Sequence, residues 1–533
     1  MPEVHHPSAE RGSPIDRWLG WLVGLVIGLG AIGTVLLVIP SGMFDLDRFS
    51  VVKELTLLVT ALVVGLVVLA RSGRIELGVS ELCLVGFLIV STISAAAATN
   101  RWISFRSLAI TLAGAAVFFG ARFAATRAGR GVVVGGVVLA VIAGSVSGLL
   151  QAYGWNWPLL ADTRAPGGTL GNRNFMAHLT VIGLPLAGWI AARARTRPGA
   201  LLGVGAMAIM TGAIVLSRSR AAWVGLGCVA AGILLIGLVT RSPTVRVGRR
   251  RALGMAVGMG LGAAAALVVP NQLDWKSRSP YRDSLRDVLN YREGSGRGRL
   301  IQYRNSLALV ARDPLLGVGP GNWMVAYPLV TTRGDPSFDA NDPIPTNPWP
   351  SSDWVALLAE RGPVASLAWL GFLASLALVA LRRAADPDHG TAALAAFGVM
   401  TAVAVQGLFD AVVLLAPPTL IGMASLGALL PATRPIRAVE LTGRRLRWLF
   451  WFGLVVGALA LKSAGQVEAI LTAADGWSTP NLVRAVRTDP GNYRLHLAIA
   501  QRAGCGTARP HAAAAARQLP YHPIPPRLVA RCR

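Results

Sequence analysis

Charge is scarce in this 533-residue chain, and so are the residues that usually bind metals or form disulfides. Asp, Glu, Lys and Arg together account for 14% of the sequence, and there are 4 Cys and 7 His. The low charge content excludes a string of soluble domains, in which about a quarter of the residues would be charged. The Cys and His residues show no spacing typical of a metal site. The sequence therefore predicts neither a metal nor a cofactor.

Lysine is almost missing, since it occurs only at Lys53, Lys276 and Lys462. The formal net charge of +25 therefore comes from arginine. A strongly basic protein raises the possibility of nucleic-acid binding, but these arginines lie in short clusters between apolar runs. Such clusters are typical of residues that orient membrane helices. We therefore expect the lipid bilayer, and no nucleic acid, as a partner.

Hydrophobic residues are abundant instead, at 53% of the chain, and they recur in long runs. A run of about 20 apolar residues crosses the ~30 Å hydrocarbon layer as a helix. The alternating ten-residue strands of a membrane β-barrel are not seen. The sequence predicts an all-α, polytopic helical membrane protein with about 13 transmembrane helices. They are expected near 18–40, 51–70, 77–98, 106–126, 131–153, 174–192, 199–217, 220–240, 252–270, 354–380, 391–415, 417–431 and 448–465.

The arginines predict an orientation for these helices, because cytoplasmic loops of membrane proteins are rich in basic residues. With a cytoplasmic N-terminus, every even-numbered connection carries arginines and the C-terminus is exported. Arg218 and Arg220 lie on the exported side against this rule, which marks them as candidate functional residues. The arginines that obey it include Arg71, Arg74, Arg122, Arg127, Arg130, Arg193, Arg195, Arg197, Arg249, Arg250, Arg251, Arg382, Arg383, Arg444, Arg445 and Arg447.

The longest polar interval, residues 271–353, lies on the exported side in this topology. Within it, apolar residues recur at helical spacing from Leu300 to Ala311, and the helix is expected to stop before Pro314. Arg299 falls in the first turn, after a flexible Gly-Ser-Gly segment at 294–296. It is interpreted either as an arginine presented to a bound anion or as a solvated loop residue.

The last segment, residues 466–533, is expected to be a small exported helical tail on a membrane domain formed by residues 1–465. Helices are predicted over Tyr493–Ala503 and Thr507–Leu519, in a pattern that resembles a degenerate tetratricopeptide-type repeat. Such a repeat buries little surface alone, so we expect the tail to pack on the membrane domain or on a partner protein. Cys505 and Cys532 share the exported compartment and can form a disulfide there.

Four segments on the predicted outer side carry a resemblance. They are GTLGNRNF at 168–175, SRSRAAW at 217–223, Arg299 followed by DPLLGVGPGN at 313–322, and DWVALLAERG at 353–362. In their order and spacing they resemble the O-antigen ligase and O-antigen polymerase superfamily of bacterial membrane glycosyltransferases. The resemblance covers residues 150–430 in outline and leaves the tail out.

This resemblance implies an enzyme with a GT-C-like helical fold in the bacterial inner membrane. It would transfer or polymerise a glycan from an undecaprenyl-diphosphate donor, without a metal, at the periplasmic face; the acceptor is a glycan, a lipid or a protein. A diphosphate leaving group needs cations, and arginine offers bidentate, permanently charged contacts. The family's two arginines fall on Arg220 and Arg299, which we expect to be catalytic. The further substrate-binding candidates are Arg218, Arg297, Arg304, Asn172 and Asn174, although a helix-entry cap explains the two asparagines equally well.

The chain departs from the family at one position. In many ligases a histidine stands nine residues before the glutamate of an Ala-Glu-x-Gly motif, whereas counting back from Glu360 leads here to Ser351. Because serine is not a base unaided, we expect the neighbouring Asp353 to act as the catalytic carboxylate and Ser351 to contact substrate. His178, within the span at 174–192, is interpreted as a packed helix residue. The missing histidine favours a polymerase-type relative or a chemistry that needs little base assistance.

Two other classes of function stay open at this point. A lipid-linked glycan transporter would show repeated halves and charges at mid-membrane, and neither pattern is evident. A non-catalytic component of a polysaccharide assembly machine would keep the fold and use the tail to recruit partners.

Overall fold

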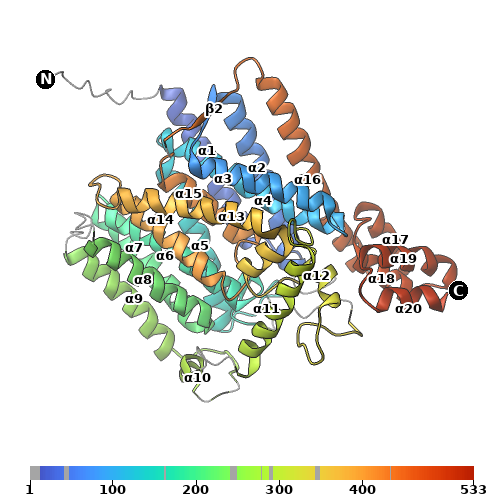
Figure 1. Ribbon diagram of the computed structural model, residues 1–533. Coiled ribbons are helices and arrows are strands. Elements are labelled where there is room, and N and C mark those ends of the chain that lie inside the picture. Colours follow the sequence, from blue (N-terminus) through green and yellow to red (C-terminus); the bar gives the residue numbers. More distant parts are fainter. Residues whose placement is uncertain are drawn as a thin grey trace.

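The computed structural model describes residues 13–40, 47–160, 164–239, 249–275, 277, 279–286, 292–342, 348–432 and 434–532. These residues form 20 α-helices, two short 3-10 helices and one pair of short strands (Figure 1). The expected all-α polytopic membrane fold is confirmed.

Thirteen apolar helices in the described part of the chain occupy the positions expected for the spans. Eleven of them are long and apolar enough to cross a membrane, and two are shorter. The long helices are α1 Pro14–Leu36, α2 Asp47–Arg71, α3 Val79–Ala97, α4 Arg101–Thr126, α5 Arg130–Ala152, α6 Arg173–Arg193, α7 Arg197–Ser217, α8 Arg220–Val239, α9 Arg249–Val268, α13 Asp353–Arg383 and α16 Arg445–Ala474. The shorter ones are α14 Gly390–Gln406 and α15 Ala416–Leu429.

Helix α15 lies at the centre of the bundle. It contacts α4, α14 and α5 in particular, and every one of its 14 residues is buried. At 1.5 Å per residue the helix is about 21 Å long, which is less than the hydrocarbon thickness. Because other helices surround α15, its length does not have to match the bilayer.

Close contacts between small residues hold neighbouring helices together. At the crossing of α1 and α5, a Cβ added to Gly136 would lie 2.5 Å from the Cα of Gly28. The two backbones therefore touch, as they do where small residues line helix interfaces in membranes.

One end of the bundle carries the arginine-rich connections. The α2–α3 connection forms strand β1 (Arg74–Leu77), which pairs antiparallel with β2 (Arg437–Glu440) before α16. Arg130 at the start of α5 donates to the carbonyl of Ala428 at the end of α15, 3.0 Å away. The start of α9 meets the end of α6 at this end too, through a 2.7 Å hydrogen bond from Arg251 to the carbonyl of Ala192. We call this end the ribbon face.

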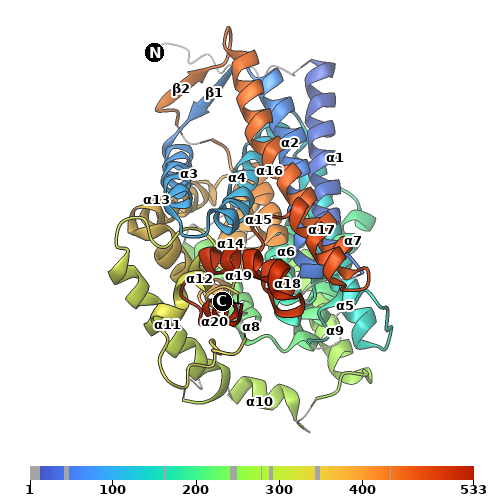
Figure 2. The same cartoon turned by 90° about the vertical axis from the view of Figure 1, so that its right-hand side faces the viewer.

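The opposite end, here called the loop face, collects the remaining connections. It carries α10 Pro280–Arg286, α11 Gly294–Arg312, α12 Trp323–Ala326, the 3-10 helices η1 Gly168–Leu170 and η4 Tyr327–Leu329, and the tail helices α17 Thr479–Thr488, α18 Tyr493–Arg502, α19 Cys505–Gln518 and α20 Ile524–Arg531. Both views show β2 and α10 at opposite ends of the molecule, with the tail beside α12 (Figures 1 and 2). The alternation of connections between the two faces agrees with the predicted order of crossings.

The tail packs on the loop of its own chain. Tyr493 and Leu497 of α18 and Leu519 after α19 share one hydrophobic cluster with Trp323 and Tyr327 of the loop. Cys505 and Cys532 form the expected disulfide. The likeness to a tetratricopeptide repeat stays a prediction.

Two boundaries differ from those expected. Helix α16 continues past residue 465 to Ala474, because Gln466, Ala469 and Ile470 still bury one face of it after the apolar run ends. The predicted helices at 493–503 and 507–519 correspond to α18 and α19, and α17 precedes them from Thr479. Helix α11 starts at Gly294, so that Arg299 lies in its second turn; it ends at Arg312, before Pro314, as predicted.

Candidate functional site

The first residue of α8, Arg220, reaches across to α11. Its guanidinium Nη2 donates a 2.7 Å hydrogen bond to Oγ of Ser295. Ser295 and Arg299 are four residues apart on α11, so they lie on the same face with Cβ atoms about 5–6 Å apart. The structure therefore brings Arg220 to within one helical turn of Arg299, although 79 positions separate them in the sequence.

Helix α6 forms a second wall of this site. Asn172 is its buried N-cap, and its side chain accepts a 3.0 Å hydrogen bond from the backbone N–H of Asn174. The Asn174 side chain donates to Oδ2 of Asp410, 3.3 Å away. Asn172 thus does what a helix-entry cap does, whereas Asn174 points into the site.

His178 lies one turn beyond Asn174 and is 1% exposed. Asp410 and Arg299 both act electrostatically on its ring, so these three residues lie in one neighbourhood. Neither ring nitrogen has a hydrogen-bond partner in the described structure. Buried polar groups normally have hydrogen-bond partners, so packing within the helix does not by itself explain His178.

The loop from Gly407 to Leu415 carries Asp410 into the site, and Asp353 holds this loop. The Asp353 carboxylate accepts hydrogen bonds from the backbone N–H groups of Val412 at 2.9 Å and Val413 at 3.0 Å. Its own N–H donates to the Gly407 carbonyl at 2.8 Å. With 3% exposure and both oxygens engaged, Asp353 is placed to fix the loop, and its role as a base stays a prediction.

Ser351 lies against α11, next to the arginines. Its backbone N–H donates to Oε1 of Gln302 at 2.6 Å, and its carbonyl accepts from the Tyr303 hydroxyl at 2.6 Å. Gln302 and Tyr303 are three and four residues beyond Arg299, on the next turn of the helix. The position at which the resembling family has a histidine therefore lies beside the Arg299 helix.

The other predicted arginines are less central. Arg218 donates to Oγ of Ser284 at 2.9 Å and lies over the Trp275 ring, 4.6 Å from its centroid, as Arg173 also does at 5.3 Å. Arg297 and Arg304 are exposed on α11. Arg220 is therefore the predicted arginine that joins α8 to α11, one helical turn from Arg299.

The 313–322 and 353–362 segments pack against each other next to the site. The backbone N–H groups of Val318 and Gly319 donate to the carbonyls of Ala359 and Glu360 at 3.0 and 2.8 Å. A Cβ on Gly317 would lie 2.5 Å from the Glu360 carbonyl carbon, and Gly317 has a φ of +64°, so only glycine fits there. Close backbone packing therefore explains the glycines of the 313–322 and 353–362 segments.

The short helix that follows is held by buried polar contacts. The Tyr327 hydroxyl donates to Oδ2 of Asp335 at 2.7 Å, and its ring lies 4.2 Å from that of Trp323. Burial, followed by the hydrogen bond to Asp335, raises the pKa of the Tyr327 phenol above its usual value. The phenol stays neutral and rigidly placed, which anchors α12 beneath α11.

The sequence did not single out Asp410 or Ser295 as site residues. The sequence feature that could have identified Asp410 is a carboxylate near the end of an apolar run. Ser295 lies in a Gly-Ser-Gly segment that looks like an ordinary linker. No group of three or more His, Cys, Asp or Glu side chains arranged to hold a metal occurs among the described residues. The site combines two arginines, one accessible carboxylate and amide and hydroxyl groups, a set suited to an anionic leaving group and a polar acceptor.

Residues 205–370 match the model of a protein family described as O-antigen ligase. The match is narrower than the region of resemblance found in the sequence, and it covers less than a third of the chain. It includes Arg220, Arg299, Ser351 and Asp353, but neither α6, Asp410 nor the tail. No curated protein matches the chain. Glycan transfer in polysaccharide assembly and a multi-pass membrane location agree with this family and with the apolar helices.

Proposed function

We propose that this protein transfers a glycan from a polyprenyl-diphosphate carrier, such as undecaprenyl diphosphate, to an acceptor hydroxyl at its loop face. The observation that carries the proposal is the hydrogen bond from Arg220 to Ser295, one turn from Arg299 on α11. Both arginines fall within the segment that matches the O-antigen ligase family. Two guanidinium groups converging from separate elements are what a diphosphate requires.

In the proposed reaction an acceptor hydroxyl attacks the anomeric carbon of the donor sugar. The new C–O bond forms as the bond from that carbon to the diphosphate oxygen breaks, and the diphosphate leaves on its lipid. Arg220 and Arg299 neutralise the negative charge that develops on the leaving oxygen. Each charge-assisted hydrogen bond contributes about 1.5–3 kcal/mol, so the pair supplies a substantial share of the transition-state stabilisation.

The hydroxyl proton needs an acceptor, and the loop face offers two carboxylates. We assign this role to Asp410 in preference to Asp353. Both carboxylates accept two hydrogen bonds, Asp410 from Asn174 and the Ala411 N–H and Asp353 from two backbone N–H groups. Asp410 is half-buried and near Arg299 and His178, whereas Asp353 is 3% exposed and out of reach of an acceptor. Asp353 then acts as a positioning residue, since it holds the loop that presents Asp410.

The orientation follows the charge distribution. The connections on the ribbon face carry most of the interhelical arginines, which supports a cytoplasmic position for that face. The disulfide between Cys505 and Cys532 lies on the opposite side, and disulfides persist in oxidising compartments such as the periplasm. We therefore place the transfer site at the periplasmic face of a bacterial inner membrane.

The test compares Arg220→Ala and Arg299→Ala with Arg312→Ala in cells that lack the native gene. Arg312 is an exposed arginine on the same helix as Arg299, about 20 Å further along it. We expect each of the first two variants to lower glycan transfer by about 10²-fold or more, and Arg312→Ala to keep it. The products are followed by gel electrophoresis, with the amount of membrane-inserted protein measured in parallel.

The gel also separates a polymerase from a ligase. A polymerase variant with reduced activity yields lipid-linked glycans of shorter length, whereas a ligase variant accumulates long glycan on the carrier lipid. Normal product from both arginine variants at normal protein levels would rule out the proposed diphosphate site. Accumulation of untransferred donor on the cytoplasmic leaflet would indicate a transporter instead.

A further inference from the structure

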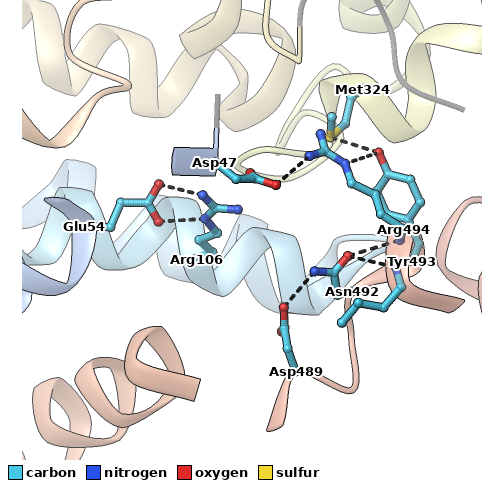
Figure 3. Close-up of polar contacts among 9 residues, drawn as sticks. Asp47, Glu54, Arg106, Met324, Asp489, Asn492, Tyr493 and Arg494 are labelled. Atoms are coloured by element: carbon cyan, nitrogen blue, oxygen red, sulfur yellow. Dashed lines mark hydrogen bonds and ion pairs between the residues drawn. The ribbon is translucent and has the colours of Figure 1, made fainter. Parts of the chain in front are cut away.

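A cavity of about 220 Å³ lies where α2, α4, the turn before α12 and the tail meet. Figure 3 shows its polar wall, which is built from α2, α4 and the segment around α18. The tail is therefore part of a chamber and does more than cover the loop.

This cavity continues towards the transfer site. A smaller cavity of about 30 Å³ shares Ser50, Glu54 and Trp349 with it and reaches Phe175 on α6. The Phe175 ring lies 6.2 Å from that of Trp349, and Phe175 directly follows Asn174, which contacts Asp410. The larger cavity thus lies one layer of side chains away from the residues that surround Asp410.

Both arginines in the cavity wall are already paired with carboxylates. Arg106 binds Glu54 through two hydrogen bonds of 2.7 and 2.8 Å. Arg494 of the tail lies 3.4 Å from Asp47, with both side chains largely buried. Carboxylates therefore engage both guanidiniums, and Asp489 and Glu360 add further acidic groups to the wall. With four carboxylates and two arginines, this wall disfavours a second phosphate, unlike the arginine pair at the transfer site, and offers carboxylate oxygens to the hydroxyls of an uncharged ligand.

Aromatic and planar polar groups complete the wall. The Trp102 indole N–H donates to Asp489, which fixes the ring at the cavity. Trp349 and Tyr493 also line it, and Asn492 holds Asp489 through a 2.9 Å hydrogen bond. A pyranose presents apolar C–H faces and a rim of hydroxyls, so aromatic rings between carboxylate acceptors and guanidinium donors match it chemically.

We propose that this cavity is a subsite for neutral sugar residues of the glycan, completed by the tail of the same chain. The inference rests on the proposed glycan transfer, and it assigns the tail a direct part in substrate recognition. Uncharged sugars occupy the cavity, while the diphosphate stays with Arg220 and Arg299. The subsite thereby selects a glycan by its hydroxyl pattern one or more sugars away from the bond that forms.

Occupancy is tested with a photo-crosslinking amino acid at Ser50, which lies at the junction of the two cavities. A second position, Ser107 on α4, lines the larger cavity, and Thr92 on the exposed side of α3 serves as the control. The full-length protein is irradiated in cells, purified, and stained for periodate-oxidisable glycan. We expect glycan adducts at Ser50 and Ser107 and none at Thr92. Adducts with lipid or protein alone, or no glycan adduct at either cavity position, overturn the subsite.

A second experiment fills the cavity with Ser50→Phe and compares it with Thr92→Phe. We expect Ser50→Phe to raise the concentration of acceptor needed for half-maximal transfer by at least about tenfold, equal to about 1.4 kcal/mol. Thr92→Phe should keep the original value. An unchanged concentration for a folded Ser50→Phe protein overturns the subsite.

The failure of the subsite can be told apart from that of the proposed function. If neither Ser50 nor Ser107 yields a glycan adduct but Arg220→Ala and Arg299→Ala abolish transfer, the function stands and the subsite falls. If glycan adducts form while both arginine variants transfer normally, the subsite stands and the diphosphate site falls.

Discussion

Replacing Gly491 by alanine tests whether the tail must be docked for the site to work. A Cβ added at Gly491 would lie 1.9 Å from Cγ and 2.3 Å from Cβ of Trp102. The Trp102 ring cannot easily move aside, because its N–H is held by Asp489 and Lys462 lies 4.1 Å from its centroid. The segment around Gly491 must therefore lift away from α4.

The free-energy change of tail docking in Gly491→Ala follows from two opposing effects. Gly491 does not have a positive φ, so alanine suits its backbone, and an unstrained Gly→Ala change would stabilise by about 0.4–1 kcal/mol. Overpacking of a well-packed contact costs about 1–3 kcal/mol. This cost exceeds the stabilisation at Gly491, because the added Cβ overlaps the Trp102 ring, which is held on two sides. We expect the docked tail to lose about 1–2 kcal/mol, which raises the undocked population about 5–30-fold.

Limited trypsin digestion of the membrane-embedded protein measures this population, since cleavage tracks the open form when opening is fast. We expect faster cleavage within residues 475–532 and weaker glycan transfer. The control is Gly506→Ala in α19, where nothing lies within 4 Å of an added Cβ. Cleavage and transfer rates for Gly491→Ala equal to those of the Gly506→Ala protein would refute the docking role of the tail.

Three further predictions concern the loop face. Asp410→Asn should lower the rate of glycan transfer by about 10²–10⁴-fold, as expected for loss of a proton acceptor. The purified variant should still bind a radiolabelled lipid-diphosphate donor. Loss of donor binding would contradict the role of Asp410 as a proton acceptor. Asp353→Ala removes the acceptor of the buried Val412 N–H and the part-buried Val413 N–H. Thermal unfolding should therefore show a loss of about 1–3 kcal/mol for the buried group, and an unchanged midpoint would show that the loop is held otherwise. The disulfide closes a loop over a sequence separation of 27. Cys505→Ser or Cys532→Ser should therefore destabilise the tail by about 3 kcal/mol. We expect faster tryptic cleavage of the tail, and a reducing agent should have the same effect on the unmodified protein.

Hydropathy and arginine placement determined the membrane architecture in advance. The apolar runs predicted thirteen spans, and the described helices occupy those positions. This succeeds because a span must satisfy its backbone hydrogen bonds within one continuous segment, so that its signal is local. Local patterns likewise indicated the end of α11 before Pro314 and the pairing of Cys505 with Cys532.

Local sequence patterns did not predict the contacts between distant segments of the chain. The sequence nominated Arg220 and Arg299 separately, but only the tertiary structure joined Arg220 to Ser295, one helical turn from Arg299. It also showed Asp410 facing Asn174 and gave Asp353 a different set of partners from those expected. Side chains that meet across the loop face have no fixed spacing in the chain, because several connections of different length deliver them.

The tail shows the same division most clearly. The sequence determined that residues after the last span form helices, since amphipathic spacing and capping residues act within a few positions. Only the tertiary structure decided that Tyr493 and Leu497 pack on Trp323 and that Arg494 reaches Asp47, enclosing the cavity. A helix's apolar face dictates that it must be covered, whereas the surface that covers it is chosen by the shape and charge of the rest of the molecule.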